Sequence, residues 1–180
     1  MAVLTRIFCF LALLIVPAIA VAETLQLEEQ EIKAGLLYNF LKYTDWPANH
    51  SSSMMVCIFG DDPFEGYLDP MNGRTVNQRS IALRKIHTIP EAEGCQLLFV
   101  NANEKGRWPQ LHKFLIGKNV LTISDFAGFV TSGGMIEFGH KDTHISADLN
   151  IDAVTVAGLR MQDRLLRLVS VVHVKQEGKP

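Results

Sequence analysis

Short runs of apolar residues, each closed by a glycine or a polar residue, constrain the fold of this chain most strongly. The first covers residues 54–59, is apolar at both odd and even positions, and is followed by Gly60. A run this short with two apolar faces is typical of a strand buried inside a parallel sheet. Three further runs have similar character: residues 80–86, 95–100 and 120–124. The core is therefore predicted to form around a sheet of buried strands.

Helical patterns lie before and between these strands. From Glu28 onward, apolar residues recur every three or four positions, which predicts an amphipathic helix that ends at Trp46 and Pro47. Asp62 and Pro63 match the N-cap and first residue of a second helix. Residues 108–116 have helical spacing again. Strands that alternate with helices favour an α/β fold, with a mostly parallel, Rossmann-like central sheet flanked by helices.

The C-terminal third is predicted to close this sheet. Residues 135–138 and 145–149 flank a polar turn at 141–143, which indicates a hairpin. Residues 153–174 are rich in Leu and Val, and Arg160, Arg164 and Arg167 recur at the spacing of one helix face. We therefore expect a C-terminal helix whose last residues run into an extended segment. No internal repeat or linker divides the chain, so a single domain is predicted.

The N-terminus has the pattern of a secretory signal. Arg6 precedes an apolar run over residues 7–22, which ends in Ala20-Val21-Ala22 before Glu23. The run is shorter than the roughly 20 residues that span a bilayer, and a small-x-small ending is typical of signal cleavage. We expect a signal peptide at residues 1–22 and one exported domain at 23–180. Because no second apolar run is long enough for an anchor, the exported domain is expected not to insert into the membrane.

The charge balance argues against a nucleic-acid partner. Seventeen Lys and Arg residues face 19 Asp and Glu residues, for a formal net charge of -2. A chain with this balance has no overall positive field to attract nucleic acid.

Polar residues follow three of the predicted strands. They are Asp61, Asp62, Asn101 and Asp125. In an open parallel sheet, ligands bind outside the carboxyl ends of the strands, and oxygen ligands there suit a magnesium ion or a cationic molecule. Asp and Asn after a strand also cap helices and close turns. The sequence leaves both interpretations open.

No catalytic or metal motif is evident. There is no G-x-S-x-G elbow, and Gly133-Gly134 lacks the downstream pattern of a phosphate loop. His140 and His144 flank the predicted turn, but two histidines fall short of the three or four protein ligands of a zinc site. We therefore predict no catalytic residues, no metal and no cofactor.

Cys57 and Cys95 remain after signal removal, as an even pair in a compartment that permits disulfides. They lie in or beside two predicted strands, and a disulfide requires those strands to be neighbours. A bridge and two separate buried thiols are both compatible with the sequence.

Several segments together resemble the YfiR family of periplasmic proteins. The likeness spans about residues 30–172. The segments are 32–40 with 43–47, 57–64, 75–79, 95–100, 121–125, 129–136, 148–150, 157–159 and 165–168. Gln78 departs from the family, which often has Gly after the Asn at this point.

The resemblance implies a periplasmic regulator. Such a protein binds the sensory region of an inner-membrane diguanylate cyclase, keeps it inactive and thereby lowers cyclic di-GMP and biofilm formation. An OmpA-like lipoprotein of the outer membrane sequesters the regulator. The family also implies a homodimer and a redox-sensitive disulfide, which maps here to Cys57 and Cys95. It implies no enzymatic residues. A small-ligand-binding signalling module that uses the strand-end residues is the alternative function.

Partner-binding residues must be nominated on physical grounds. Tyr43, Trp46 and Pro47 stand at the end of the first predicted helix, where aromatic side chains often anchor interfaces. The second nomination is the predicted basic stripe of Arg160, Arg164 and Arg167, which suits an acidic partner. The competing interpretations are an aromatic clamp onto the sheet and an ordinary solvated helix face.

Overall fold

The computed structural model describes residues 16–47, 52–142, 144–167 and 169–173. Its strands are β1 (Thr44–Asp45), β2 (Ser53–Phe59), β3 (Thr75–Val76), β4 (Arg79–Ile86), β5 (Leu97–Val100), β6 (Leu121–Ser124), β7 (Ile136–Lys141), β8 (His144–Asn150), β9 (Arg160–Met161) and β10 (Ser170–Val172). Its α-helices are α2 (Val16–Lys42), α3 (Trp108–Leu115), α4 (Ile151–Val156) and α5 (Asp163–Leu166). Its 3-10 helices are η1 (Asp69–Met71), η2 (Ile89–Ala92), η3 (Ala102–Arg107) and η4 (Val130–Ser132).

Eight of these strands form one mostly parallel sheet, which confirms the predicted α/β class. Their order is β10-β8-β7-β6-β5-β2-β4-β3. The pairs β3–β4 and β7–β8 are antiparallel, and the other pairs in this sheet are parallel. The predicted C-terminal hairpin is therefore present as β7 and β8.

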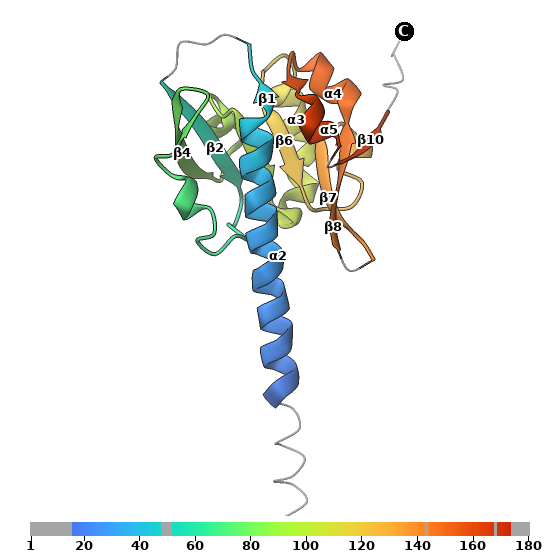
Figure 1. The fold of residues 1–180 in the computed structure, drawn as a ribbon. Helices are drawn as coiled ribbons and strands as arrows, with labels where there is room; N and C mark the ends of the chain where they lie inside the picture. Colours follow the sequence, from blue (N-terminus) through green and yellow to red (C-terminus); the bar gives the residue numbers. More distant parts are fainter. Residues whose placement is uncertain (1–15, 48–51, 143, 168, 174–180) are drawn as a thin grey trace, which may run out of the picture.

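Helices cover both faces of the sheet (Figure 1). Side chains alternate between faces along a strand, so Val56 and Ile58 pack toward α2, whereas Cys57 and Phe59 pack toward α3. On the first face, α2 contributes Leu37, Phe40 and Leu41 to the larger core. On the second face, α3 contributes Trp108, Leu111 and Leu115. Burial on both faces explains why residues 54–59 of β2 and all of β5 are apolar at every position.

The first helix ends earlier than predicted. Its last residue is Lys42, and residues 44–45 leave the helix to pair with β9, which comes more than a hundred residues later in the chain. The Asn77 side-chain amide also donates to the Lys42 carbonyl at 3.4 Å. Both contacts are non-local, so the periodicity around Trp46 and Pro47 did not reveal them.

The amino-terminal part of α2 extends away from the body of the domain (Figure 1). Because α2 begins at Val16, the predicted cleavage point after Ala22 falls inside this helix. Residues 1–15 lie outside the described residues, and the signal peptide stays a prediction. Within the described ranges, no helix is both long and apolar enough to cross a membrane.

The predicted helix start at Asp62-Pro63 is wrong. The segment forms consecutive turns, in which Asp62 Oδ1 accepts a hydrogen bond from the Phe64 backbone N–H at 2.9 Å. Glu65 and Gly66 then both take positive φ values of 48° and 91°, which a right-handed helix does not allow. An aspartate that caps a helix also closes a turn, so the Asp-Pro pair did not distinguish the two.

The single C-terminal helix predicted over residues 153–174 is also wrong. The chain forms α4, β9, α5 and β10 in succession. Gly158, at φ 70°, ends the first short helix, and the Val-rich end pairs with β8 as an edge strand. Residues 168 and 174 lie outside the described part. The predicted extended ending is present as β10.

Candidate functional site

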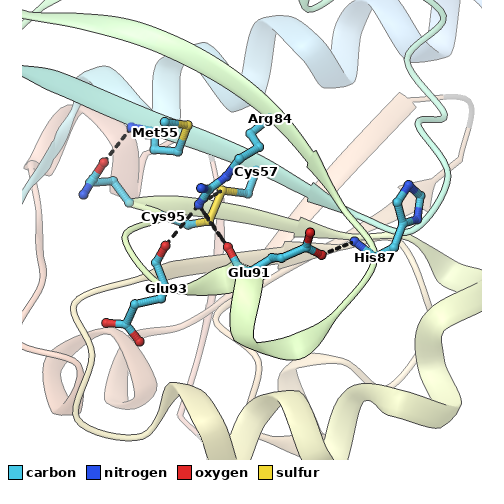
Figure 2. The surroundings of a disulfide bond; sticks show 8 residues. Met55, Cys57, Arg84, His87, Glu91, Glu93 and Cys95 are labelled. Carbon is cyan, nitrogen blue, oxygen red and sulfur yellow. Dashed lines mark hydrogen bonds between the residues drawn. A yellow bond between two sulfur atoms is a disulfide. The ribbon is translucent and has the colours of Figure 1, made fainter.

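A disulfide joins Cys57 and Cys95, with their Cα atoms 5.9 Å apart (Figure 2). Cys57 lies in β2, and Cys95 lies two residues before the neighbouring strand β5. The Gln96 side chain extends this pairing, because its Oε1 accepts from the Met55 backbone N–H at 2.6 Å. The strands β2 and β5 are thus parallel neighbours, which the sequence alone did not show. The two cysteines form a disulfide and are not two separate buried thiols.

Arg84 lies against this disulfide (Figure 2). It is directly opposite Cys57 in the β2–β4 pairing, so both side chains leave the same face of the sheet. One guanidinium nitrogen of Arg84 lies 3.5 Å from Cys95 Sγ and 3.8 Å from Cys57 Sγ. The same nitrogen donates to the carbonyl oxygens of Glu91 and Glu93, at 2.9 and 3.0 Å. Arg84 thus ties β4 to the loop that carries Cys95.

A second carboxylate orders the start of the same loop. Glu91 Oε2 accepts from the backbone N–H groups of His87 and Thr88, at 3.0 and 2.7 Å, and from the Thr88 hydroxyl. The hydroxyl of Thr88 and these backbone donors lower the pKa of Glu91 below its usual value. Residues 87–95 are therefore held at both ends before the chain enters β5.

Both sulfurs are buried, and neither cysteine is more than 3% exposed. Thiol–disulfide exchange requires an attacking thiolate to reach a sulfur atom. The native fold therefore shields this bond from reductants, and the bond braces β2 against β5.

Side chains of the protein itself pack at the strand ends where a ligand site was predicted. Strand order reverses between β2 and β5, which is where ligands bind in doubly wound folds. There the Asn101 side-chain amide donates to the Asp61 carbonyl at 2.8 Å, and its Oδ1 accepts from the Asn103 N–H. The Glu104 side chain packs so closely on Gly60 that its Cγ would lie 2.7 Å from an added Cβ. At this end of the sheet, the side chains of Asn101 and of Glu104 in η3 therefore occupy the space beside Gly60 and Asp61.

The carboxylates of the predicted cluster pair with different lysines. Asp62 lies 3.0 Å from Lys85 Nζ, whereas Asp125 lies 3.1 Å from Lys33 Nζ on α2. Lys33 is buried and also contacts Glu29 at 2.7 Å. Among the described residues, no group of three or more His, Cys, Asp or Glu side chains is arranged to hold a metal ion. His140 and His144 occupy successive pairs of the β7–β8 ladder and so leave opposite faces.

Two of the nominated partner-binding groups meet in the structure. The antiparallel pair β1–β9 places Asp45 opposite Arg160, and Gln162 N–H donates to the Tyr43 carbonyl at 3.0 Å. The Arg164 guanidinium lies 5.6 Å from the Tyr43 ring centroid and donates to its hydroxyl at 3.4 Å. Lys42 lies 5.1 Å from the same ring. We call Lys42, Tyr43, Arg160 and Arg164 the Tyr43 patch.

Charge and hydrogen bonding at the Tyr43 patch affect the phenol. Lys42 and then Arg164 lower the pKa of the Tyr43 hydroxyl. The two arginines and Lys42 are exposed, so the patch is a basic and aromatic surface. Its arginines come from a strand and a short helix rather than from one helix face, which corrects the predicted stripe.

The remaining nominated residues, Trp46, Pro47 and Arg167, have different surroundings. Trp46 packs against the larger core, as the clamp interpretation requires, and its indole N–H is buried without a partner among the described residues. Pro47 is exposed. Arg167 lines a separate hollow beside the tip of the β7–β8 hairpin, together with Lys141 and His144.

One hollow beside α3 was not predicted from the sequence. It has a volume of about 750 Å³ and lies between α3, η4 and α4. We call it the α3–α4 groove. Ile116, Val156 and His112 line it, and the exposed fractions of Ile116 and Val156 are 70% and 72%. The helical pattern of residues 108–116 marked the helix but could not show which later segment would lie beside it.

The fold and these sites define a single-domain α/β protein braced by one buried disulfide, with a basic surface patch and an apolar groove. A model of the YfiR/HmsC-like family matches residues 30–170, and the chain belongs to that family. The comparison with curated proteins gave no match. The family indicates a periplasmic regulator of diguanylate cyclase signalling, regulatory rather than catalytic.

Proposed function

We propose that this protein is a periplasmic repressor that binds the sensory region of an inner-membrane diguanylate cyclase and lowers cyclic di-GMP production. The observation that carries this proposal is the match to the YfiR/HmsC-like family over residues 30–170. Repression by binding requires only that the protein prefer the inactive conformation of the cyclase, so that the population shifts toward it. No chemical step by this chain is needed.

The Tyr43 patch is the surface that we assign to the cyclase. It combines an aromatic ring with the cationic side chains of Lys42 and Arg164, and the exposed Arg160 lies on the paired strand β9. Aromatic and arginine side chains dominate the energy of many interfaces, and a positive surface favours an acidic partner. The expected counterpart is an acidic segment of the sensory region.

Cellular cyclic di-GMP tests the repressor function. Deletion of the gene is expected to raise cyclic di-GMP and biofilm formation in cells that contain an intact cognate cyclase. The full chain is expected to restore the low level, whereas a version without residues 1–22 is expected to fail because it stays in the cytoplasm. An unchanged cyclic di-GMP level on deletion would contradict the proposal.

A matched pair of charge reversals tests the assigned surface. Arg164→Glu removes the cation beside Tyr43 and repels an acidic partner, so repression is expected to be lost while the fold persists. Arg74→Glu is the control, because Arg74 is also exposed and also lies over a tyrosine, 5.9 Å from the Tyr38 ring centroid. Equal repression by both variants would exclude the Tyr43 patch and leave the repressor function to the deletion experiment.

We further propose that the protein is a homodimer and that an OmpA-like outer-membrane lipoprotein sequesters it. Both proposals rest on the resemblance to the YfiR family. Light scattering of the purified protein measures the first, with a monomeric mass as the contrary result. Co-purification of the lipoprotein with the exported chain tests the second.

The alternative is a small-ligand-binding module at Asp61, Asp62, Asn101 and Asp125. Side chains that fill this end of the sheet give no support to it. It stays a prediction, which a thermal-shift screen tests. A ligand that stabilises the wild type but not an Asp61→Ala, Asp62→Ala variant would revive it.

A further inference from the structure

We propose that the α3–α4 groove binds a small amphiphilic carboxylate, such as a medium-chain fatty acid, with its apolar chain between Ile116 and Val156. This inference is independent of the proposed repression. It concerns a ligand site on the protein itself, whose lining includes neither the predicted strand-end residues nor any residue of the Tyr43 patch.

The shape of the groove suits a ligand of this size. Its volume of about 750 Å³ lies inside the usual range of small-molecule sites, roughly 300–1,000 Å³. Thr122 and Met135 form part of its floor, and both are buried. The Asn119 side-chain amide donates to the Ala157 carbonyl at 2.7 Å, which ties the segment after α3 to the end of α4. The walls are therefore held in place without a ligand.

The walls of the groove carry large apolar side chains that are exposed to solvent. Ile116 and Val156 are the two most exposed large apolar side chains of the described residues, and both line this groove from different elements. Leu115, Val120 and Ala153 continue the apolar lining inward. Burial of apolar surface away from water is favourable, so an aliphatic chain between the walls is stabilised by leaving water.

The polar groups of the groove favour an anionic head. His112 and Lys118 line it, and none of its lining residues is Asp or Glu. Lys118 Nζ lies 2.6 Å from Glu93 and 4.6 Å from the Phe114 ring centroid. An ammonium group has three N–H donors, so the exposed Glu93 leaves donors for a second carboxylate.

His112 adds a second hydrogen-bonding group to the lining. Its ring stacks on Trp108, with centroids 5.1 Å apart, and packs against the Gly133 backbone. The ring has no hydrogen-bond partner among the described residues. Burial lowers the pKa of His112, which favours the uncharged ring with its one donor and one acceptor.

Titration calorimetry with decanoate tests the site on protein purified after expression of the full chain. Decanol and decylamine share the chain but differ in charge, and decanoate is expected to bind most tightly. Lys118→Met is expected to weaken decanoate by about tenfold while leaving decanol unchanged, since it removes only the cation. Equal binding of all three amphiphiles would overturn the carboxylate assignment.

Paired aspartate variants locate the binding. Ile116→Asp with Val156→Asp places two carboxylates on the groove and is expected to weaken decanoate by about tenfold or more. Ile32→Asp on α2 is the control, because Ile32 is 53% exposed and lies outside the groove. All three positions are exposed, so the folds are expected to survive, which thermal unfolding checks. Wild-type affinity in the groove variant, or no decanoate binding by the wild type, would overturn the proposal.

A protein partner in the groove would give a different pattern. The groove variant would then lose repression of cyclic di-GMP, while the wild type would bind no decanoate. That result overturns the ligand assignment and leaves the repressor function standing. If the purified protein binds decanoate but deletion of the gene leaves cyclic di-GMP unchanged, the ligand site is supported and only the proposed function is contradicted.

Discussion

Gln78 is a residue in a conformation that its side chain disfavours. It follows Asn77 in the two-residue turn between β3 and β4, and both residues have positive φ, 50° and 64°. Such a turn favours Asn-Gly, because glycine lacks the Cβ that makes this region costly. Gln78→Gly is therefore expected to raise the free energy of unfolding by about 1 kcal/mol, measured by urea denaturation.

Gln110→Gly supplies the matched control. Gln110 is exposed in α3, where glycine is expected to lower the free energy of unfolding by about 1 kcal/mol. The same substitution thus has opposite signs at the two positions. A loss of stability at both positions would show that the turn does not strain Gln78.

Arg84 is predicted to brace the disulfide loop. Arg84→Met keeps much of the side-chain volume but removes the bonds to the carbonyls of Glu91 and Glu93. Hydrogen bonds from a charged group contribute roughly 1.5–3 kcal/mol, so a loss of about 2 kcal/mol in unfolding free energy is expected. Arg167→Met, at an exposed residue outside that loop, is expected to change it by less than about 0.5 kcal/mol. Equal losses of unfolding free energy in the Arg84→Met and Arg167→Met variants would contradict the role of Arg84 in bracing the loop.

At the level of elements, the sequence predicted what is local and missed what is not. The runs at 54–59, 80–86, 95–100 and 120–124 were identified correctly as strands, and the central ones, such as 54–59, are apolar on both faces because helices cover both faces of the sheet. The run at 153–174 has a helical arginine spacing, yet its strands pair with segments outside the run, β1 near the start of the domain and β8 just before the run. Its spacing carried no information about those partners.

The packing of α2 on the sheet depends on the buried charge of Lys33, which was not predicted from the sequence. Lys33 is buried and bridges Glu29 on its own helix to Asp125 after β6. Lys33→Met leaves two largely buried carboxylates without their cation, and a loss of about 2 kcal/mol is expected. Lys85→Met removes the exposed partner of Asp62 and is expected to cost less than about 1 kcal/mol. Thermal and urea unfolding of both variants measure the difference.

The effect of Lys33→Met is expected to depend on pH. Burial raises the pKa of Glu29, but Lys33, with His140 adding to it, outweighs burial and holds that pKa below 4.5. A lowered folded-state pKa contributes stability above the unfolded pKa, and this is lost as the pH falls below about 4.5. Without Lys33, burial raises the pKa of Glu29 and protonation relieves the unpaired charge. The difference in unfolding free energy between the wild type and the Lys33→Met variant should therefore become smaller from about pH 7 to about pH 4. A difference that stays constant with pH would contradict this account.

For the whole molecule, the nominated sites divide according to how much they depend on tertiary structure. Cys57 and Cys95 were paired correctly through the family resemblance, since their bond needs only that β2 and β5 be neighbours. Tyr43 and Arg164 were nominated separately, and only the β1–β9 pairing brought them together. The α3–α4 groove was missed because no local pattern distinguishes an exposed Ile116 beside a groove from one in open solvent.

The disulfide is expected to stabilise the whole domain and to resist reduction while the domain is folded. Its cysteines are 38 residues apart, and closing a loop of that length contributes about 4 kcal/mol in the chain-entropy model. Alanine at both positions is therefore expected to lower the unfolding free energy by about that amount, measured by urea denaturation. Since both sulfurs are buried, a mild dithiol is expected to expose alkylatable cysteines only when denaturant is added. The intact mass of the protein after alkylation measures both effects. Two labels on the native, unreduced protein would exclude the disulfide. Rapid labelling under native reducing conditions would show that the fold does not shield the disulfide. Slow native reduction would in turn mean that any redox response of this protein requires the β2–β5 region to open first.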